Sequence, residues 1–149
     1  MMKNYKIGFD FFGLLLFLIL MLPNFIWFAI PAPNDVLRKA SVTTTIDMIA
    51  SVCQVLMIMI LCFLKHKESG KLRLSPLIVI AIVSCTLYYL SWVAYYTGLV
   101  NPMIILGLTV FPCMSFLFFA LDRKKISAIV PISMFTICHV IYGVINFIM

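Results

Sequence analysis

Charged residues are scarce in this chain of 149 residues. Lys and Arg number 11 and Asp and Glu 5, so that 11% of the residues are charged, against about 25% in an ordinary soluble domain. Hydrophobic residues make up 64%. So few charges cannot cover the surface of a globule of this length, which excludes a soluble globular domain and a disordered tail. We therefore expect most of the chain to lie in lipid.

The short motifs that mark common enzyme sites are absent as well. The sequence has no HExxH, GxSxG, GxGxxG or P-loop pattern, and no stretch with clustered Glu and His. The five cysteines lie in apolar stretches without CxxC or Cys/His spacing, as small buried hydrophobic residues do. We expect a protein that is not an enzyme, with no catalytic residue, no metal and no cofactor.

Acidic residues are missing from the middle of every long apolar stretch. All of them fall at or beyond the ends of such stretches: Asp10, Asp35, Asp47, Glu68 and Asp122. Proton- or cation-coupled transporters usually keep a carboxylate near the middle of the membrane, so coupled transport is disfavoured. We expect Asp10 to pair with Lys6, one turn away, and Asp47 to lie near a helix N-terminus, where negative charge is favourable.

Five apolar stretches are long enough to cross about 30 Å of hydrocarbon as helices. Strands of a membrane barrel would alternate apolar and polar residues, whereas these stretches are apolar on all sides, and a helix satisfies its own backbone in lipid. The fold class is therefore predicted as all-α: one polytopic transmembrane bundle in a single domain, residues 1–149. The predicted spans cover residues 9–30, 46–64, 76–98, 102–121 and 126–147.

Helix-capping residues support three of the predicted helix starts. Thr44 and Asp47 have the spacing of a capping box. Ser75-Pro76 and Asn101-Pro102 each place a good N-cap before a proline at the first helical position. The short connections at 99–101 and 122–125 predict two tight antiparallel hairpins.

The basic residues predict the orientation in the membrane. Only Arg38 and Lys39 would lie on one side, and the other side would hold Lys3, Lys6, Lys65, Lys67, Lys71, Arg73, Arg123, Lys124 and Lys125. The positive-inside rule then predicts a cytoplasmic N-terminus and an extracytoplasmic C-terminus in the cytoplasmic membrane. The first apolar run exceeds the ~7–15 residues of a signal-peptide core, so we expect it to be retained as a span.

Neutral polar side chains fall at similar depths in several spans. Gln54, Tyr88 and His139 each lie about 10–13 residues from the cytoplasmic end, so about 15–20 Å deep, and Asn24 lies slightly beyond. With Trp92 they are the candidate ligand-binding residues, lining a small pocket near the middle of the membrane. The alternative is that each finds a separate partner on a neighbouring helix.

Two prolines are candidate helix breaks, Pro23 and Pro112. Each removes one backbone hydrogen bond and frees the carbonyl four residues earlier, at Ile19 and Leu108. Asn24 is expected to repair part of the loss at Pro23. The freed carbonyls either contact a substrate, as in the broken helices of transporters, or the prolines serve packing alone.

Aromatic residues are densest between residues 88 and 96. The outer part of this run, Tyr95 and Tyr96, is typical of the aromatic belt at headgroup depth, as are Trp27 and Phe28. The alternative interpretation is a stacking surface for an apolar or cationic ligand.

The length and the five predicted spans resemble those of the tryptophan-rich sensory protein/translocator family. That resemblance implies a five-helix protein that binds porphyrins and sterol-like ligands. The sequence departs from the family's pattern because Trp27 and Trp92 are its only tryptophans and its first hairpin is not rich in Trp and Pro. We do not assign the chain to that family.

The expected function is non-catalytic binding or an accessory role, in which the bundle holds a small apolar ligand or partner helices. The alternative is a transporter or permease subunit that acts as an oligomer. The expected partners are the lipid bilayer, a second copy of the chain or another membrane protein, and an apolar ligand. Nucleic acid is excluded because no basic face of a folded domain exists to bind it.

Overall fold

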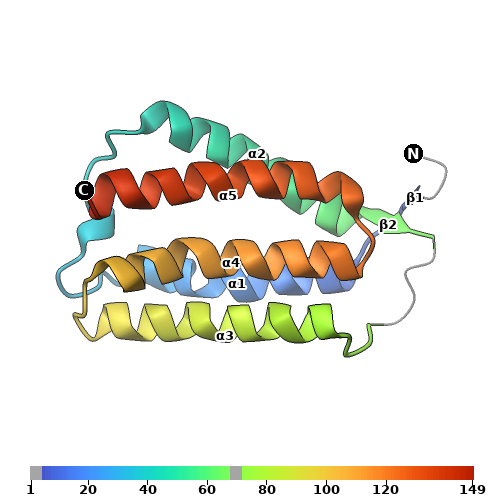
Figure 1. The fold of residues 1–149 in the computed structure, drawn as a ribbon, viewed down its shortest axis with the longest axis horizontal. Coiled ribbons are helices and arrows are strands. Elements are labelled where there is room, and N and C mark those ends of the chain that lie inside the picture. The colour runs from blue at the N-terminus through green and yellow to red at the C-terminus, as the bar shows by residue number, and fades with distance from the viewer. Residues whose placement is uncertain (1–4, 68–71) are drawn as a thin grey trace.

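Five long helices run side by side along the molecule in the computed structural model, which describes residues 5–67 and 72–149 (Figure 1). They are α1 (Phe11–Ala29), α2 (Thr44–Phe63), α3 (Pro76–Tyr96), α4 (Pro102–Asp122) and α5 (Ile126–Phe147). All five are long and apolar enough to cross a membrane. The prediction of an all-α polytopic bundle is confirmed, with helix ends within about two residues of the predicted ones.

A pair of short strands, which the sequence analysis does not predict, joins the beginning of the chain to the end of α2. β1 (Tyr5–Ile7) and β2 (Leu64–His66) are antiparallel. The backbone N–H groups of Gly8 and Asp10 continue the pairing by donating to carbonyls in the last turn of α2. The strands, the α4–α5 turn and the start of α3 lie at one end of the bundle, which we call the strand end (Figure 1). Lys3, Glu68 and Lys71 lie outside the described residues.

Two of the three predicted helix caps are confirmed. The Ser75 hydroxyl accepts a hydrogen bond from an N–H in the first turn of α3 at 3.2 Å, and the Asn101 amide oxygen does the same for α4 at 3.0 Å. The capping box starting at Thr44 is wrong, because Thr43 is the N-cap of α2. The Thr43 hydroxyl donates to the Asp47 carboxylate at 3.0 Å, since the two side chains lie one turn apart.

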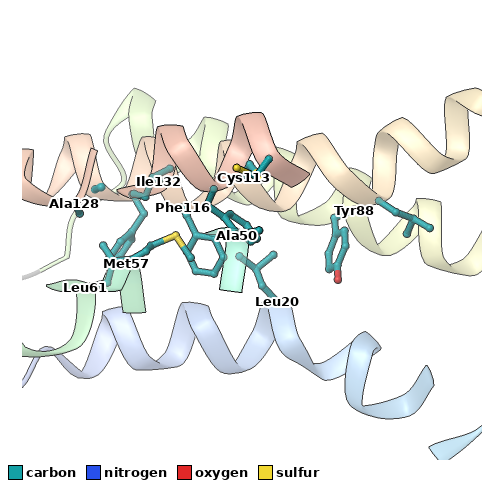
Figure 2. Close-up of a cluster of buried hydrophobic side chains, with 14 of the residues drawn as sticks. Leu20, Ala50, Met57, Leu61, Tyr88, Cys113, Phe116, Ala128 and Ile132 are labelled. Carbon is teal, nitrogen blue, oxygen red and sulfur yellow. The ribbon is translucent and has the colours of Figure 1, made fainter. Parts of the chain in front are cut away.

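The helices differ in how much of their surface they bury. α3 packs along α4, α4 along α5, and α5 along α2, whereas α1 has fewer contacts, chiefly with α2 and α3. Only three residues of α1 are buried, Gly13, Leu20 and Pro23. Figure 2 shows Leu20 pointing from α1 toward the cluster of core side chains that contains Phe116. α1 is therefore the most loosely packed of the five helices.

Glycine allows one close approach of α1. A Cβ at Gly13 would collide with the backbone carbonyl of Leu61 on α2. Gly8, by contrast, would place a Cβ at an ordinary 3.7 Å from a side-chain carbon of Lys65. The strand end of α1 is thus held tightly against the end of α2, although the rest of α1 is not.

Three prolines lie inside helices, and the sequence analysis considered only two of them. Pro23 lies in α1, Pro112 in α4 and Pro131 in α5, and all three are buried. The helices continue on both sides of each proline. The prolines therefore remove single hydrogen bonds without dividing a span.

The carbonyl that Pro23 frees is occupied by a tyrosine. The Tyr89 hydroxyl on α3 donates to the Ile19 carbonyl at 2.6 Å. Asn24, which was expected to repair this loss, donates to the Leu20 carbonyl at 3.3 Å, so that expectation is wrong. Its side chain lies one turn after Leu20, and the carbonyl of that residue is the one within its reach. The carbonyl that Pro23 frees thus accepts a hydrogen bond that links α1 to α3.

Candidate ligand-binding site

A cavity of about 430 Å³ lies among the five helices. Most of its lining comes from the second halves of α1, α3 and α5 and the first halves of α2 and α4, so most of it lies in the part of the bundle away from the strand end. Leu37, from the short 3₁₀ helix η2 (Val36–Arg38), also lines it. The volume lies within the ~300–1,000 Å³ typical of pockets for small ligands.

The five residues proposed from the sequence all line this cavity: Asn24, Gln54, Tyr88, Trp92 and His139. They come from α1, α2, α3 and α5. Pro112 also lines the cavity, whereas Pro23 does not. The structure therefore brings together side chains that lie far apart in the sequence, around one space.

Two of these residues bond to each other. The Asn24 amide donates to the Tyr88 hydroxyl at 2.7 Å, and Figure 2 shows that hydroxyl pointing toward α1. This part of the site matches the expectation that polar groups find partners on neighbouring helices. The bond also joins α1 to α3 at the edge of the cavity.

Trp92 is buried among aromatic rings and keeps an unused hydrogen-bond donor. Its ring lies 6.4 Å from that of Trp27, 6.3 Å from that of Tyr88 and 5.8 Å from that of Tyr95. The indole N–H makes no hydrogen bond of ordinary geometry within residues 5–67 and 72–149. A buried donor without an acceptor costs about 1–3 kcal/mol. A ligand that brings an acceptor to this N–H would therefore be favoured.

His139 and Gln54 also keep hydrogen-bonding capacity. The His139 ring stacks between Phe135, at 5.0 Å, and Tyr142, at 6.1 Å, and neither ring nitrogen has a hydrogen bond to another described residue. The Gln54 amide makes one weak contact, 3.9 Å to the sulfur of Met21. Both side chains can therefore donate to or accept from a molecule in the cavity.

The segment after α1 folds over this end of the bundle and is tied down through Asp35. The Asp35 carboxylate accepts from the Trp27 indole at 2.8 Å, the Arg38 guanidinium at 2.9 Å and the Tyr95 hydroxyl at 2.8 Å. The Tyr96 hydroxyl donates to a backbone carbonyl at the end of α1. These aromatic residues, expected in a headgroup belt, thus also fasten the covering segment to α1 and α3.

The strand end holds a buried ion cluster instead of a cavity. Asp10 is paired with Lys125 at 2.9 Å and with Arg123 at 3.6 Å, and all three side chains are buried. The Lys125 ammonium also donates to the Leu61 carbonyl. The predicted pair of Asp10 with Lys6 is wrong, because strand pairing places Lys6 opposite another lysine on β2, exposed to solvent. Lys125 and Arg123 are thus buried in the bundle and do not face headgroups and water.

The pKa values of Asp10 and Lys125 in this cluster are both lowered. Burial by itself would raise the pKa of the Asp10 carboxyl, but the hydrogen bond and charge of Lys125, together with the charge of Arg123, lower it below the usual value. Burial lowers the pKa of Lys125, and the Asp10 carboxylate opposes that change. With two cations facing it, Asp10 stays ionised at neutral pH.

The sequence analysis missed other residues that line the cavity. Asp47, Ala50, Ser51 and Gln54 all line it from α2, and their spacing of three, four and seven residues places them on one face of a helix. That spacing is visible in the sequence and could have identified Asp47 from its distance to Gln54. The sequence analysis explains Asp47 by its place at a helix start instead, because the helix dipole stabilises an acidic residue there.

No group of three or more potential metal-ligating side chains is found in the part of the chain that the structure describes. Comparisons of the chain with known protein families, with curated proteins and with solved structures find no match.

Proposed function

We propose that this multi-pass membrane protein is a non-catalytic binding protein of the cytoplasmic membrane that holds a small, mainly apolar ligand in the cavity. The observation that carries the proposal is the convergence of polar side chains with spare hydrogen-bonding capacity, Gln54, Trp92 and His139, on a space of about 430 Å³ lined by all five helices. A mainly apolar wall with a few polar groups is the usual composition of a small-molecule site.

The proposed orientation places the strand end in the cytoplasm. Exposed basic residues gather at that end, among them Lys6, Lys67 and Arg73, while Arg38 and Lys39 lie at the other end. The cavity would then lie in the outer half of the membrane. Protease or alkylation tags at the two termini should find the N-terminus inside and the C-terminus outside, and finding both on one side would refute this orientation.

Transport by an oligomer is the second function that the sequence suggested. It would be favoured by a polar seam on the outside of the bundle. On α3, however, the hydroxyls of Thr86 and Ser91 donate to carbonyls of their own helix, at 3.0 and 2.9 Å. These two hydroxyls therefore already have hydrogen-bond acceptors within α3. The cavity supports ligand binding better than these groups support transport.

Native mass spectrometry from a mild detergent tests the proposed binding. The wild-type protein should carry a small-molecule adduct, and Ala50→Leu, which enlarges a buried side chain on the cavity wall, should reduce its occupancy at least about tenfold. Val52→Leu is the matched control, because Val52 lies on the same helix, is 56% exposed and does not line the cavity. Equal adduct on all three proteins would contradict binding in this cavity.

A further inference from the structure

We infer that the ligand of this cavity is an organic cation, an amine or quaternary ammonium group attached to an apolar body. This inference rests on the proposed function and names the class of ligand. It follows from three features of the cavity: its charge, its aromatic wall and the placement of its polar groups.

Asp47 is the one acidic residue that lines the cavity, and no Lys or Arg lines it. Asp47 forms no ion pair with any residue in 5–67 or 72–149, and its carboxylate accepts one hydrogen bond, from the Thr43 hydroxyl. Asp10 and Asp35 differ from it, since Asp10 pairs with Lys125 and Asp35 pairs with Arg38. The cavity thus contains a carboxylate whose charge the protein itself does not neutralise.

The wall of the cavity is rich in aromatic rings. Those that line it are Trp27, Phe28, Tyr88, Trp92, Phe116, Phe135, Tyr142 and Phe147. The face of an aromatic ring carries negative potential and attracts a cation, by about 0.5–2 kcal/mol for each well-placed ring. A carboxylate and aromatic faces both favour a positive ligand, and both disfavour an anion.

The order of groups along α2 gives the ligand a direction. Asp47 lies in the first turn, and Gln54 lies seven residues deeper, about 10 Å along the helix. A cationic group beside Asp47 would therefore leave the apolar body to extend toward Phe116, where the amide of Gln54 can meet a polar atom of the ligand.

Asp47 also has an explanation that needs no ligand. A carboxylate in the first turn of a helix is stabilised by the helix dipole, whatever the neighbouring cavity contains. That explanation predicts no preference between a cation and a neutral molecule of the same shape. The test therefore compares two such molecules.

Benzyltrimethylammonium and neopentylbenzene form the matched pair, since they differ in replacing the quaternary nitrogen by carbon. Binding is measured by intrinsic fluorescence in nanodiscs of zwitterionic phosphatidylcholine, because both tryptophans of the chain line the cavity. We expect the cation to bind the wild-type protein at least about tenfold more tightly than the neutral probe. Asp47→Asn should remove this preference and leave the affinity for neopentylbenzene unchanged.

Asp122→Asn is the matched control. It removes the same charge at the strand end, outside the cavity, and keeps an oxygen that can accept the hydrogen bond from Ser75. Its preference for the cation should equal that of the wild-type protein. If Asp47→Asn does not fold, as judged by its thermal unfolding without probe, the comparison of the two probes on the wild-type protein decides the question alone.

The outcomes separate this inference from the proposed function. Equal affinity of the two probes, or a preference that survives Asp47→Asn, would overturn the cationic ligand and leave binding in the cavity standing. If neither probe binds and native mass spectrometry finds no adduct, the proposed function itself is overturned.

Discussion

The two ends of the bundle use similar residues in different ways. Asp10 at the strand end and Asp47 at the cavity end both stand at the beginning of a helix. Asp10 is buried against two cations, and Gly13 nearby allows backbone contact between α1 and α2. Asp47 has no cationic partner in the described part of the chain and borders a cavity.

This difference indicates a division of roles along α1. At the strand end, the Asp10 carboxylate faces two cations and α1 packs tightly against α2, which is how a helix is held in place. At the cavity end, α1 contributes Asn24 and Trp27 to a wall with unused hydrogen-bonding groups. The strand end should therefore control stability, and the cavity end should control binding. The predictions below test this division.

The largest expected effect is that of Asp10→Asn. This substitution removes the carboxylate that pairs with the buried Lys125 ammonium, and breaking a buried ion pair in this way costs about 3–5 kcal/mol. Thermal unfolding in detergent should show a large fall in Tm. Asp47→Asn should change the Tm little, and adding Lys125→Met to Asp10→Asn should recover part of the loss. Similar losses for Asp10→Asn and Asp47→Asn would break the comparison.

Acid should also destabilise the strand end, because protonation of Asp10 removes the same negative charge. The folded-state pKa of Asp10 is lowered, so its stabilising contribution is complete above the unfolded value of about 3.9 and is lost as the pH falls through the lower folded value. The Tm of the wild-type protein should therefore fall below about pH 4, and that of Asp10→Asn should fall less. Parallel pH profiles for the two proteins would show that Asp10 is not the group responsible.

A smaller loss of stability is expected when a methyl group is added at Gly13. Gly13→Ala forces α1 away from the Leu61 carbonyl, and overpacking of this kind costs about 1–3 kcal/mol. Gly8→Ala is the matched control, because its Cβ meets only a flexible lysine side chain at 3.7 Å, and its Tm should match that of the wild-type protein. Equal Tm values for the two variants would refute tight packing at the strand end.

The smallest loss of stability is expected from Tyr89→Phe, a substitution between the two ends of the bundle. Tyr89→Phe removes the hydrogen bond to the Ile19 carbonyl, and bonds between membrane helices contribute about 0.6 kcal/mol on average. Pro23→Ala restores a backbone N–H for the same carbonyl, so Tyr89→Phe should cost less in that background. An equal cost of Tyr89→Phe in both backgrounds, measured by unfolding in detergent, would show that the proline does not create the need for this bond.

Much of the fold could be predicted because it depends on local properties of the sequence. The length and hydropathy of an apolar run determine whether it can span a membrane, and caps such as Ser75 and Asn101 act within one turn. Counting residues from one end of each span predicts that Gln54, Tyr88 and His139 lie at one level of the bundle, and all three line the cavity. Since the five helices run side by side, side chains at one level of different helices can line one cavity (Figure 1).

The contacts that could not be predicted depend on how distant segments meet. Nothing local distinguishes Lys125, which is buried, from Lys124 beside it, because the difference arises only when the beginning of α1 packs against the α4–α5 turn. β1 and β2 are three residues each, too short for an alternating pattern to be recognised. The role of Asp35 likewise depends on Trp27 and Tyr95 from two different helices.

The pairing of Asp10 with Lys125 also bears on how the chain assembles during synthesis. Asp10 directly precedes α1, whereas Lys125 directly precedes α5, so that three helices are synthesised between α1 and α5. While the intervening helices are inserted, the Asp10 carboxylate lacks the Lys125 ammonium that pairs with it in the folded structure. The ion pair of Asp10 with Lys125 can therefore form only after α4 and the α4–α5 turn have been synthesised.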